Sequence, residues 1–334
     1  MYSRLWRMVL TCCCVTLSSS LWPGSETRAA QMGVLIPAYF HPTAAGSWQR
    51  LNDAAAQIPL IAILNPNSGP GAMRDPSYVK AVNELRRCGG SVVGYVSSSY
   101  TQRSFDLVKQ DIDLYRSFYA IDGIFVDEMT ADDLGAHVQY YRRVYDYIKS
   151  LDRKYRVITN PGTQVEEIYA RTPCADILVT FESDNGYPFY SPSGWTSGYS
   201  PDRFCHLVYD VASAAVMTNY VHLADTRRAA WVYITDDKGA NPWDRLPAYW
   251  ESLVQSIKSR NDLTAQGSRL TWTVSANAWL SISNEGPPGL YVTQVSSNLG
   301  TWISTNTNKS TTGSFLVTNV SVIPSSQSYY RVFR

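Results

Sequence analysis

Gly-Ile-Phe-Val-Asp-Glu at residues 123–128 and Ile-Leu-Val-Thr-Phe-Glu at residues 177–182 are two short apolar runs that each end in a carboxylate. Apolar runs of this length, without polar alternation, are typical of parallel strands that are buried on both faces. The acids that close them are Asp127 and Glu128 in the first run and Glu182 in the second. The fold of the rest of the chain decides whether these acids meet.

Six further apolar runs bring the number of expected strands to eight. The eight runs cover residues 33–40, 59–66, 91–98, 123–128, 156–160, 177–182, 205–211 and 231–236. Segments with apolar residues at three- and four-residue spacing alternate with them, at 48–57, 77–87, 104–118, 134–151, 164–171, 212–227 and 246–258. Strands alternating with helices in this number predict a (β/α)8 TIM barrel over residues 31–258. The competing open doubly wound sheet has a glycine-rich phosphate turn after its first strand, and here that strand ends in Pro-Ala-Tyr-Phe-His-Pro.

The composition changes after residue 258. Residues 259–269 are polar and predict a linker. Residues 270–334 hold short runs rich in Thr, Val, Tyr and Trp at hairpin spacing, which predict a small all-β, sandwich-like module. Such a module could hold a polysaccharide or a cell surface, or it could serve stability or export.

Residues 1–30 have the pattern of a secretory signal peptide. Arg4 and Arg7 give a positive start, an apolar stretch follows, and Ala29-Ala30 offers a small-residue cleavage site. We therefore expect a secreted protein, extracellular or at the cell surface, with no membrane span after cleavage. An uncleaved anchor, or an acylated cysteine in the run at residues 12–14, is the alternative.

The charge is balanced, with 29 Lys+Arg against 28 Asp+Glu, so no basic footprint for nucleic acid is present. Aromatic residues make up 13% of the chain, which fits a carbohydrate binder because flat amphipathic rings pack on sugar faces. Without a CxxC motif or a His-rich cluster, we expect no metal and no organic cofactor. In the mature chain Cys174 and Cys205 could form a disulfide, or these two and Cys88 could be small buried hydrophobes.

Polar and aromatic residues follow nearly every expected strand. In a TIM barrel the loops after the strands build the active site, so these residues are candidates for binding a polar substrate. His41, which precedes a proline, could equally be a loop residue. The candidates are Tyr39, His41, Asn65, Asn67, Tyr95, Asn160, Tyr209 and Asp236.

The three acids are the candidates for catalysis. Alternate strands of a barrel send side chains into the same layer, so Asp127, Glu128 and Glu182 can face one another across the mouth. Paired carboxylates are the groups that hydrolyse glycosidic bonds, with retention at a separation of about 5–5.5 Å and inversion at about 6.5–9.5 Å. We favour retention. Because neighbouring residues of a strand point to opposite faces, we expect only one of Asp127 and Glu128 to do the chemistry. Helix capping or ion pairing is the alternative role.

The long loop at residues 183–203 follows directly from Glu182 and is rich in aromatic residues, Gly and Pro. Loops of this length in a compact domain are usually functional, which predicts a wall or lid with Tyr187 and Trp195 as platforms for sugar rings. Packing of the same rings against the barrel is the alternative.

Residues 33–258 resemble the spherulin-4-like family. The matching stretches include Ile-Leu-Asn-Pro-Asn-Ser-Gly-Pro at 63–70, Gly-Ile-Phe-Val-Asp-Glu at 123–128, Asn-Pro-Gly at 160–162 and Thr-Phe-Glu at 180–182. The resemblance implies a barrel glycoside hydrolase that cleaves α-1,4-linked N-acetylgalactosamine or galactosamine in a microbial biofilm exopolysaccharide such as galactosaminogalactan. It also implies Asp127 as nucleophile or cation stabiliser, Glu182 as acid/base and Glu128 in support.

Three functions therefore stand as hypotheses. The leading one is an endo-acting glycoside hydrolase that works as a monomer on a polysaccharide. The others are a secreted polysaccharide-binding protein without turnover and a structural coat or matrix protein. Polymer binding without product release would favour the second, and absence of sugar binding would favour the third.

Overall fold

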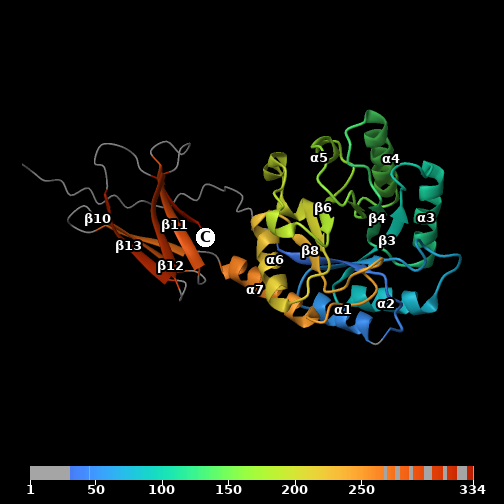
Figure 1. Cartoon of the computed structure of the whole chain (residues 1–334), viewed down its shortest axis with the longest axis horizontal. Helices are drawn as coiled ribbons and strands as arrows, with labels where there is room; N and C mark the ends of the chain where they lie inside the picture. The colour runs from blue at the N-terminus through green and yellow to red at the C-terminus, as the bar shows by residue number, and fades with distance from the viewer. Residues whose placement is uncertain are drawn as a thin grey trace, which may run out of the picture.

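The computed structural model describes the backbone of residues 31–266 except residue 45, together with six strands between residues 269 and 333, and the side chains of residues 31–262 except residue 45. Eight parallel strands form a closed barrel in chain order, which confirms the predicted TIM barrel (Figure 1). They are β1 Gly33–Ala38, β2 Leu60–Leu64, β3 Ser91–Ser97, β4 Gly123–Asp127, β5 Arg156–Thr159, β6 Ile177–Ser183, β7 Phe204–Val208 and β8 Trp231–Ile234. Their residues are almost all buried because the inner face fills the barrel and the outer face meets the helices.

Helices follow most strands and begin at residues that the sequence marks. Asp75 caps α2 by accepting from the Ser77 amide, Ser104 caps α3, and Ser213 caps α6. The helix expected at 164–171 is reduced to a single turn. The helices of the barrel are α1 Ser47–Ala55, α2 Pro76–Arg87, α3 Phe105–Phe118, α4 Gly135–Leu151, α5 Ile168–Arg171, α6 Ala214–Thr226 and α7 Trp250–Gln266.

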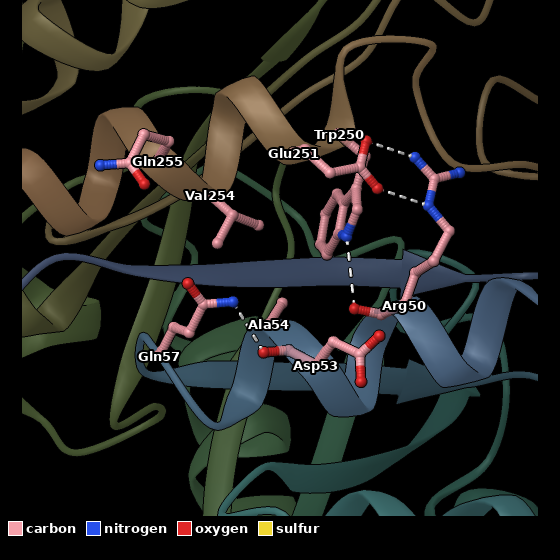
Figure 2. Close-up of a pocket in the computed structure, with 8 residues that line it drawn as sticks. All are labelled: Arg50, Asp53, Ala54, Gln57, Trp250, Glu251, Val254 and Gln255. Atoms are coloured by element: carbon pink, nitrogen blue, oxygen red, sulfur yellow. Dashed lines mark hydrogen bonds and ion pairs between the residues drawn. The ribbon is translucent and has the colours of Figure 1, made fainter.

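The barrel closes where the first helix meets the last. Arg50 on α1 forms two hydrogen bonds, of 2.8 and 2.9 Å, with the Glu251 carboxylate on α7, and the Trp250 indole donates to the Arg50 carbonyl at 3.4 Å (Figure 2). Met32 and Asn261 exchange two further bonds of 2.8 Å. A cavity of about 260 Å³ remains between the two helices. Residues on and next to α1 and on α7 line this cavity, so it belongs to the seam between these two helices on the outside of the barrel.

The connection from β6 to β7, residues 184–203, was expected to be a lid, and the structure shows a different role. Three 3-10 turns replace the crossover helix here: η1 Tyr187–Phe189, η2 Gly194–Gly198 and η3 Pro201–Arg203. The Tyr187 ring is fully buried against Phe181, and its hydroxyl is 2.9 Å from Nδ1 of the buried His206. The Trp195 indole packs on Phe204, at the start of β7, and donates to the Val165 carbonyl at 3.1 Å. These rings cover the outside of the barrel. The buried Tyr187 ring leaves no exposed face for a sugar, whereas Trp195 is partly buried and its role as a platform stays a prediction.

The chain after the barrel differs from the prediction in one respect. Helix α7 continues to Gln266, so most of the expected linker at 259–269 is helical. Beyond it lie two three-stranded antiparallel sheets, in the orders β13-β10-β9 and β12-β11-β14, in keeping with an all-β module. Their strands are β9 Arg269–Val274, β10 Trp279–Glu285, β11 Gly289–Ser296, β12 Ile303–Ser310, β13 Ser314–Ser321 and β14 Tyr329–Phe333.

Two other predictions concern the N-terminus and the cysteines. The expected signal peptide, residues 1–30, lies outside the described residues. Within the described part of the chain, no helix combines the length and the apolar character that crossing a bilayer requires. Cys174 and Cys205 are both buried and free, and the Cys174 thiol donates to the Val138 carbonyl at 3.6 Å. They are therefore buried thiols and do not form the disulfide considered above.

Candidate active site

One amide joins the two carboxylates that the sequence singles out. Asn160 follows β5, which lies between β4 and β6 in the barrel. Its Nδ2 donates to Asp127 Oδ1 at 2.8 Å and to Glu182 Oε2 at 2.6 Å. Bonds of 2.8 and 2.6 Å to one nitrogen cannot leave the two oxygens more than 5.4 Å apart. The carboxylates of Asp127 and Glu182 thus form a close pair at the carboxyl ends of the strands.

The backbone around Asn160 fixes this arrangement. The Asn160 amide N–H donates to Val126 of β4, the Asn160 carbonyl accepts from Met129, and the Gly162 carbonyl accepts from Glu182. The Asn160 Oδ1 accepts from the Gly162 N–H at 2.9 Å, which orients the side-chain amide with both its hydrogens toward the acids. Gly162 has φ +66°, a left-handed conformation that glycine adopts without a steric penalty. The bridging amide is therefore held before any ligand arrives.

Glu128 reaches the site by an unusual turn. Strand β4 ends at Asp127, and Glu128 has φ +55°, a left-handed conformation that costs a residue with a Cβ about 1–2 kcal/mol. Its carboxylate accepts a hydrogen bond from the hydroxyl of Ser97, which pairs with Asp127 across β3 and β4. Strand alternation does not govern Glu128, because this residue lies beyond the strand. Asp127 and Glu128 therefore lie near the same site, with Glu128 tied to Ser97.

Burial shifts the protonation of the pair. Burial raises the pKa of Glu182 to about 7, the Asn160 hydrogen bond opposes that rise, and the nearby Asp127 charge adds to it. Burial also raises the pKa of Asp127, and hydrogen bonds from Tyr95 and Asn160 oppose that shift. At neutral pH Glu182 can therefore carry a proton, while Asp127 receives two hydrogen bonds that favour its ionised form. One acid and one base side by side is the arrangement that acid/base hydrolysis needs.

Three predicted aromatic residues surround the acids. Tyr95 donates its hydroxyl to Asp127, and its ring meets Tyr39 edge-on at 5.7 Å between centroids. Burial, and after it the Asp127 charge, raises the pKa of Tyr39 well above its usual value. Tyr209 follows β7 on the other side; burial, Asp184 and Glu182 raise its pKa. With Asn160, these three residues lie around the acids, and their role in substrate binding stays a prediction.

Three other predicted residues have different surroundings. His41 Nε2 lies 3.3 Å from Asp75, the cap of α2, and the His41 ring packs on Tyr78. Asn65 accepts from the Gly69 N–H at 2.8 Å and so shapes its own loop. Asp236 forms an ion pair of 2.8 Å with Arg245. These three have structural partners, and their role in substrate binding stays a prediction.

Asn67 keeps a place in the candidate site. It is exposed and lines a hollow of about 460 Å³, together with Ser97 and Arg103. Ser97 also contacts Glu128, so the hollow lies next to that acid.

Two further residues belong to the site but were absent from the predicted set. Ser97 holds Glu128, and the Trp243 ring meets the Tyr209 ring edge-on at 5.5 Å between centroids. Ser97 ends an apolar run, so the strand-end argument includes it, although it is not among the candidates named above. Trp243 lies nine residues after β8 in a loop without periodicity, and the local sequence carries no signal for its position.

Comparisons with known proteins agree with the fold. The model of spherulation-specific family 4 matches residues 33–257. Spherulin-4 of Physarum polycephalum is 31% identical over 250 residues, which cover 71% of this chain and 73% of that protein. Among solved structures, Aspergillus clavatus Sph3 in complex with GalNAc has a TM-score of 0.60 at 23% identity, over 69% of this chain and 99% of that one. The family match and the identity to spherulin-4 together show that this chain belongs to spherulation-specific family 4.

Proposed function

We propose that this protein is a glycoside hydrolase that cleaves α-1,4-linked N-acetylgalactosamine or galactosamine within an exopolysaccharide. The observation that carries the proposal is the Asn160 amide, which holds Asp127 and Glu182 within 5.4 Å of each other, oxygen to oxygen. The galactosamine substrate is supported by the family and by the GalNAc bound in the Sph3 structure. The predicted signal peptide supports secretion.

The chemistry follows from the protonation of the pair. Glu182, with its raised pKa, donates its proton to the glycosidic oxygen as the bond from that oxygen to C1 breaks. The Asp127 carboxylate attacks C1 and forms a glycosyl ester. Glu182, now ionised, then takes a proton from water, whose oxygen attacks C1 and releases Asp127. The upper limit of 5.4 Å between the two oxygens lies below the separation of about 6.5–9.5 Å of inverting enzymes, so retention is the expected outcome.

Asn160 and Glu128 have supporting roles in this scheme. The Asn160 amide keeps the two carboxylates at a fixed distance while the charge moves between them. Glu128, held by Ser97, adds negative charge beside the positively charged transition state.

The test is hydrolysis of defined oligomers. The purified protein is incubated with N-acetylgalactosamine oligomers and with galactosaminogalactan, and mass spectrometry follows the products. Glu182→Gln and Asp127→Asn serve as near-isosteric controls, and NMR of the first product records the anomer. We expect shorter oligomers with retained α configuration from the native protein and none from either variant. Polymer binding without release of products would overturn catalysis and favour a binding protein.

A further inference from the structure

A strained turn lies between β3 and α3. Ser99, Tyr100 and Thr101 have φ of +46°, +53° and +71°, three consecutive left-handed residues of which none is glycine. Each such residue carries a steric cost that persists only where the surrounding structure enforces it. Strain of this kind clusters at functional sites, so the turn calls for an explanation.

The surroundings of the turn do enforce its shape. The buried Ser98 hydroxyl bonds to the carbonyl oxygens of Asp127 at 3.0 Å and Glu128 at 2.9 Å. The Tyr100 N–H donates to the same Glu128 carbonyl at 2.7 Å. At the far end, the Arg103 guanidinium donates to the Ser97 carbonyl at 2.9 Å and pairs with Asp111 at 2.8 Å. The turn is therefore bound to the two residues that carry the acids of β4.

What the turn presents to solvent is a tyrosine ring. Tyr100 is 56% exposed, although its backbone is fixed at the rim of the site. After burial, the charges of Glu128, Asp127 and Glu182 contribute to a raised Tyr100 pKa. An exposed aromatic ring on a rigid backbone offers apolar contact area at little entropic cost on binding.

We propose that Tyr100 is a substrate-binding platform on which a sugar ring of the polysaccharide stacks beside Glu128. This inference rests on the proposed function and adds a binding contact to it. The sugar's C–H face packs on the ring, next to Glu128, whose carbonyl accepts from the Tyr100 N–H. The strain in the turn is what holds the ring at this position.

Two substitutions separate the ring from the backbone. Tyr100→Phe keeps the ring, whereas Tyr100→Asn removes it and suits the left-handed conformation better than tyrosine does. Phe189, 92% exposed on the β6–β7 connection, supplies the control Phe189→Ala for loss of an exposed aromatic ring elsewhere. A melting curve for each variant verifies that it is folded.

The readouts are KM and kcat on N-acetylgalactosamine hexamer, and calorimetric binding of the same hexamer in a Glu182→Gln background. For Tyr100→Asn we expect KM and Kd to rise about 5- to 10-fold with kcat within twofold, as loss of one stacking contact implies. Tyr100→Phe and Phe189→Ala should stay within twofold of the parent protein.

The outcomes distinguish this inference from the proposed function. Cleavage with an unchanged KM and Kd in Tyr100→Asn would overturn the platform and leave the hydrolase standing. Binding that Tyr100→Asn weakens, in a native protein that releases no product, would support the platform and overturn the hydrolase. If Tyr100→Phe weakens binding as much as Tyr100→Asn does, the ring is not the contact and the inference fails.

Discussion

Two connections leave the same rim of the barrel and make opposite uses of their aromatic residues. The turn after β3, residues 98–104, is short and strained, and it ties the ends of β3 and β4 together under an exposed Tyr100. The connection after β6, residues 184–203, is long and aromatic, and it buries Tyr187 against the outside of the barrel. The comparison teaches that aromatic content and length do not mark a functional loop. The useful distinction is where the aromatic ring lies. Tyr100 stays at the rim, whereas Tyr187 packs against the outside of the barrel.

The largest effect on activity is expected at Glu182, the residue that precedes the long connection. Glu182→Gln removes the proton donor without changing the shape of the side chain, so kcat on N-acetylgalactosamine oligomers should fall about 1,000-fold, on the order of 4 kcal/mol in the barrier. The matched substitution within the connection, Tyr187→Phe, should leave kcat within twofold. If Glu182→Gln keeps a tenth of the native kcat, the assignment of the acid is wrong.

A change of similar size, in stability and not in chemistry, is expected inside the connection. Tyr187→Ala empties a fully buried site beside Phe181 and His206, which should lower the free energy of unfolding by about 3–4 kcal/mol. Urea denaturation measures the loss, and kcat of the folded protein should stay within twofold. Phe189→Ala in the same turn is the control, and its exposed ring should matter by less than about 0.5 kcal/mol. If Tyr187→Ala loses kcat but little stability, the interpretation of this connection as a lid over the site is supported instead.

The protonation of Glu182 should make both the stability and the rate depend on pH. The pKa of Glu182 is about 7 in the folded protein, above its ordinary value, so the folded state holds the proton more tightly than the unfolded chain does. The resulting stabilisation is complete below the unfolded pKa of about 4.5 and is lost as pH rises through 7, for a total of about 3 kcal/mol. The raised pKa of Asp127 acts in the same direction.

Thermal melts from pH 4 to 8 measure this slope, and Glu182→Gln should flatten most of it. Activity should decline above pH 7, where the acid loses its proton. An equal slope in native protein and variant would mean that Glu182 titrates normally.

The smallest of these effects is expected in the other connection, the turn after β3. Ser98→Ala removes a buried hydroxyl that bonds to the carbonyls of Asp127 and Glu128, so the free energy of unfolding should fall by about 1–3 kcal/mol. Because the same bonds position Glu128, kcat should fall several-fold as well. Stability and activity should thus change together in this turn and separately in the β6–β7 connection. If Ser98→Ala reduces stability but leaves kcat at the native value, the bonds of Ser98 are structural only, as the contacts of Tyr187 are.

The sequence was sufficient for the barrel and for the acids, for a physical reason. Strands buried on both faces are continuously apolar, and the polar residues that interrupt them, such as Asp127, Asn160 and Glu182, mark the rim directly. The strand-end argument does not distinguish residues that turn toward the mouth from residues with local partners. His41 meets Asp75 and Asp236 meets Arg245 because of helix positions that no strand pattern encodes.

The error at residues 184–203 and the absence of Trp243 from the predicted set share another cause. Each of these segments lacks regular periodicity, so its sequence carries no signal for the side of the barrel that it covers. A missing crossover helix leaves the outer face of β6 and β7 open, and the aromatic residues that follow Glu182 fill it. The left-handed backbone conformation of Glu128 likewise depends on the neighbouring turn after β3. Because the residue is not glycine, the sequence alone does not predict this conformation.

The seam between the first and last barrel helices has a consequence for the order of folding. Strand β1 pairs with β8, Met32 bonds to Asn261 across 229 positions, and Arg50 bonds to Glu251 across 201. A ribosome making about 5–20 residues per second needs roughly 10–50 s to produce that length. During this interval β1 carries an unpaired hydrogen-bonding edge, and no chain that ends before Asn261 can complete the seam. Barrel closure therefore has to wait until Asn261 has been made, because its partner Met32 lies 229 positions earlier in the chain.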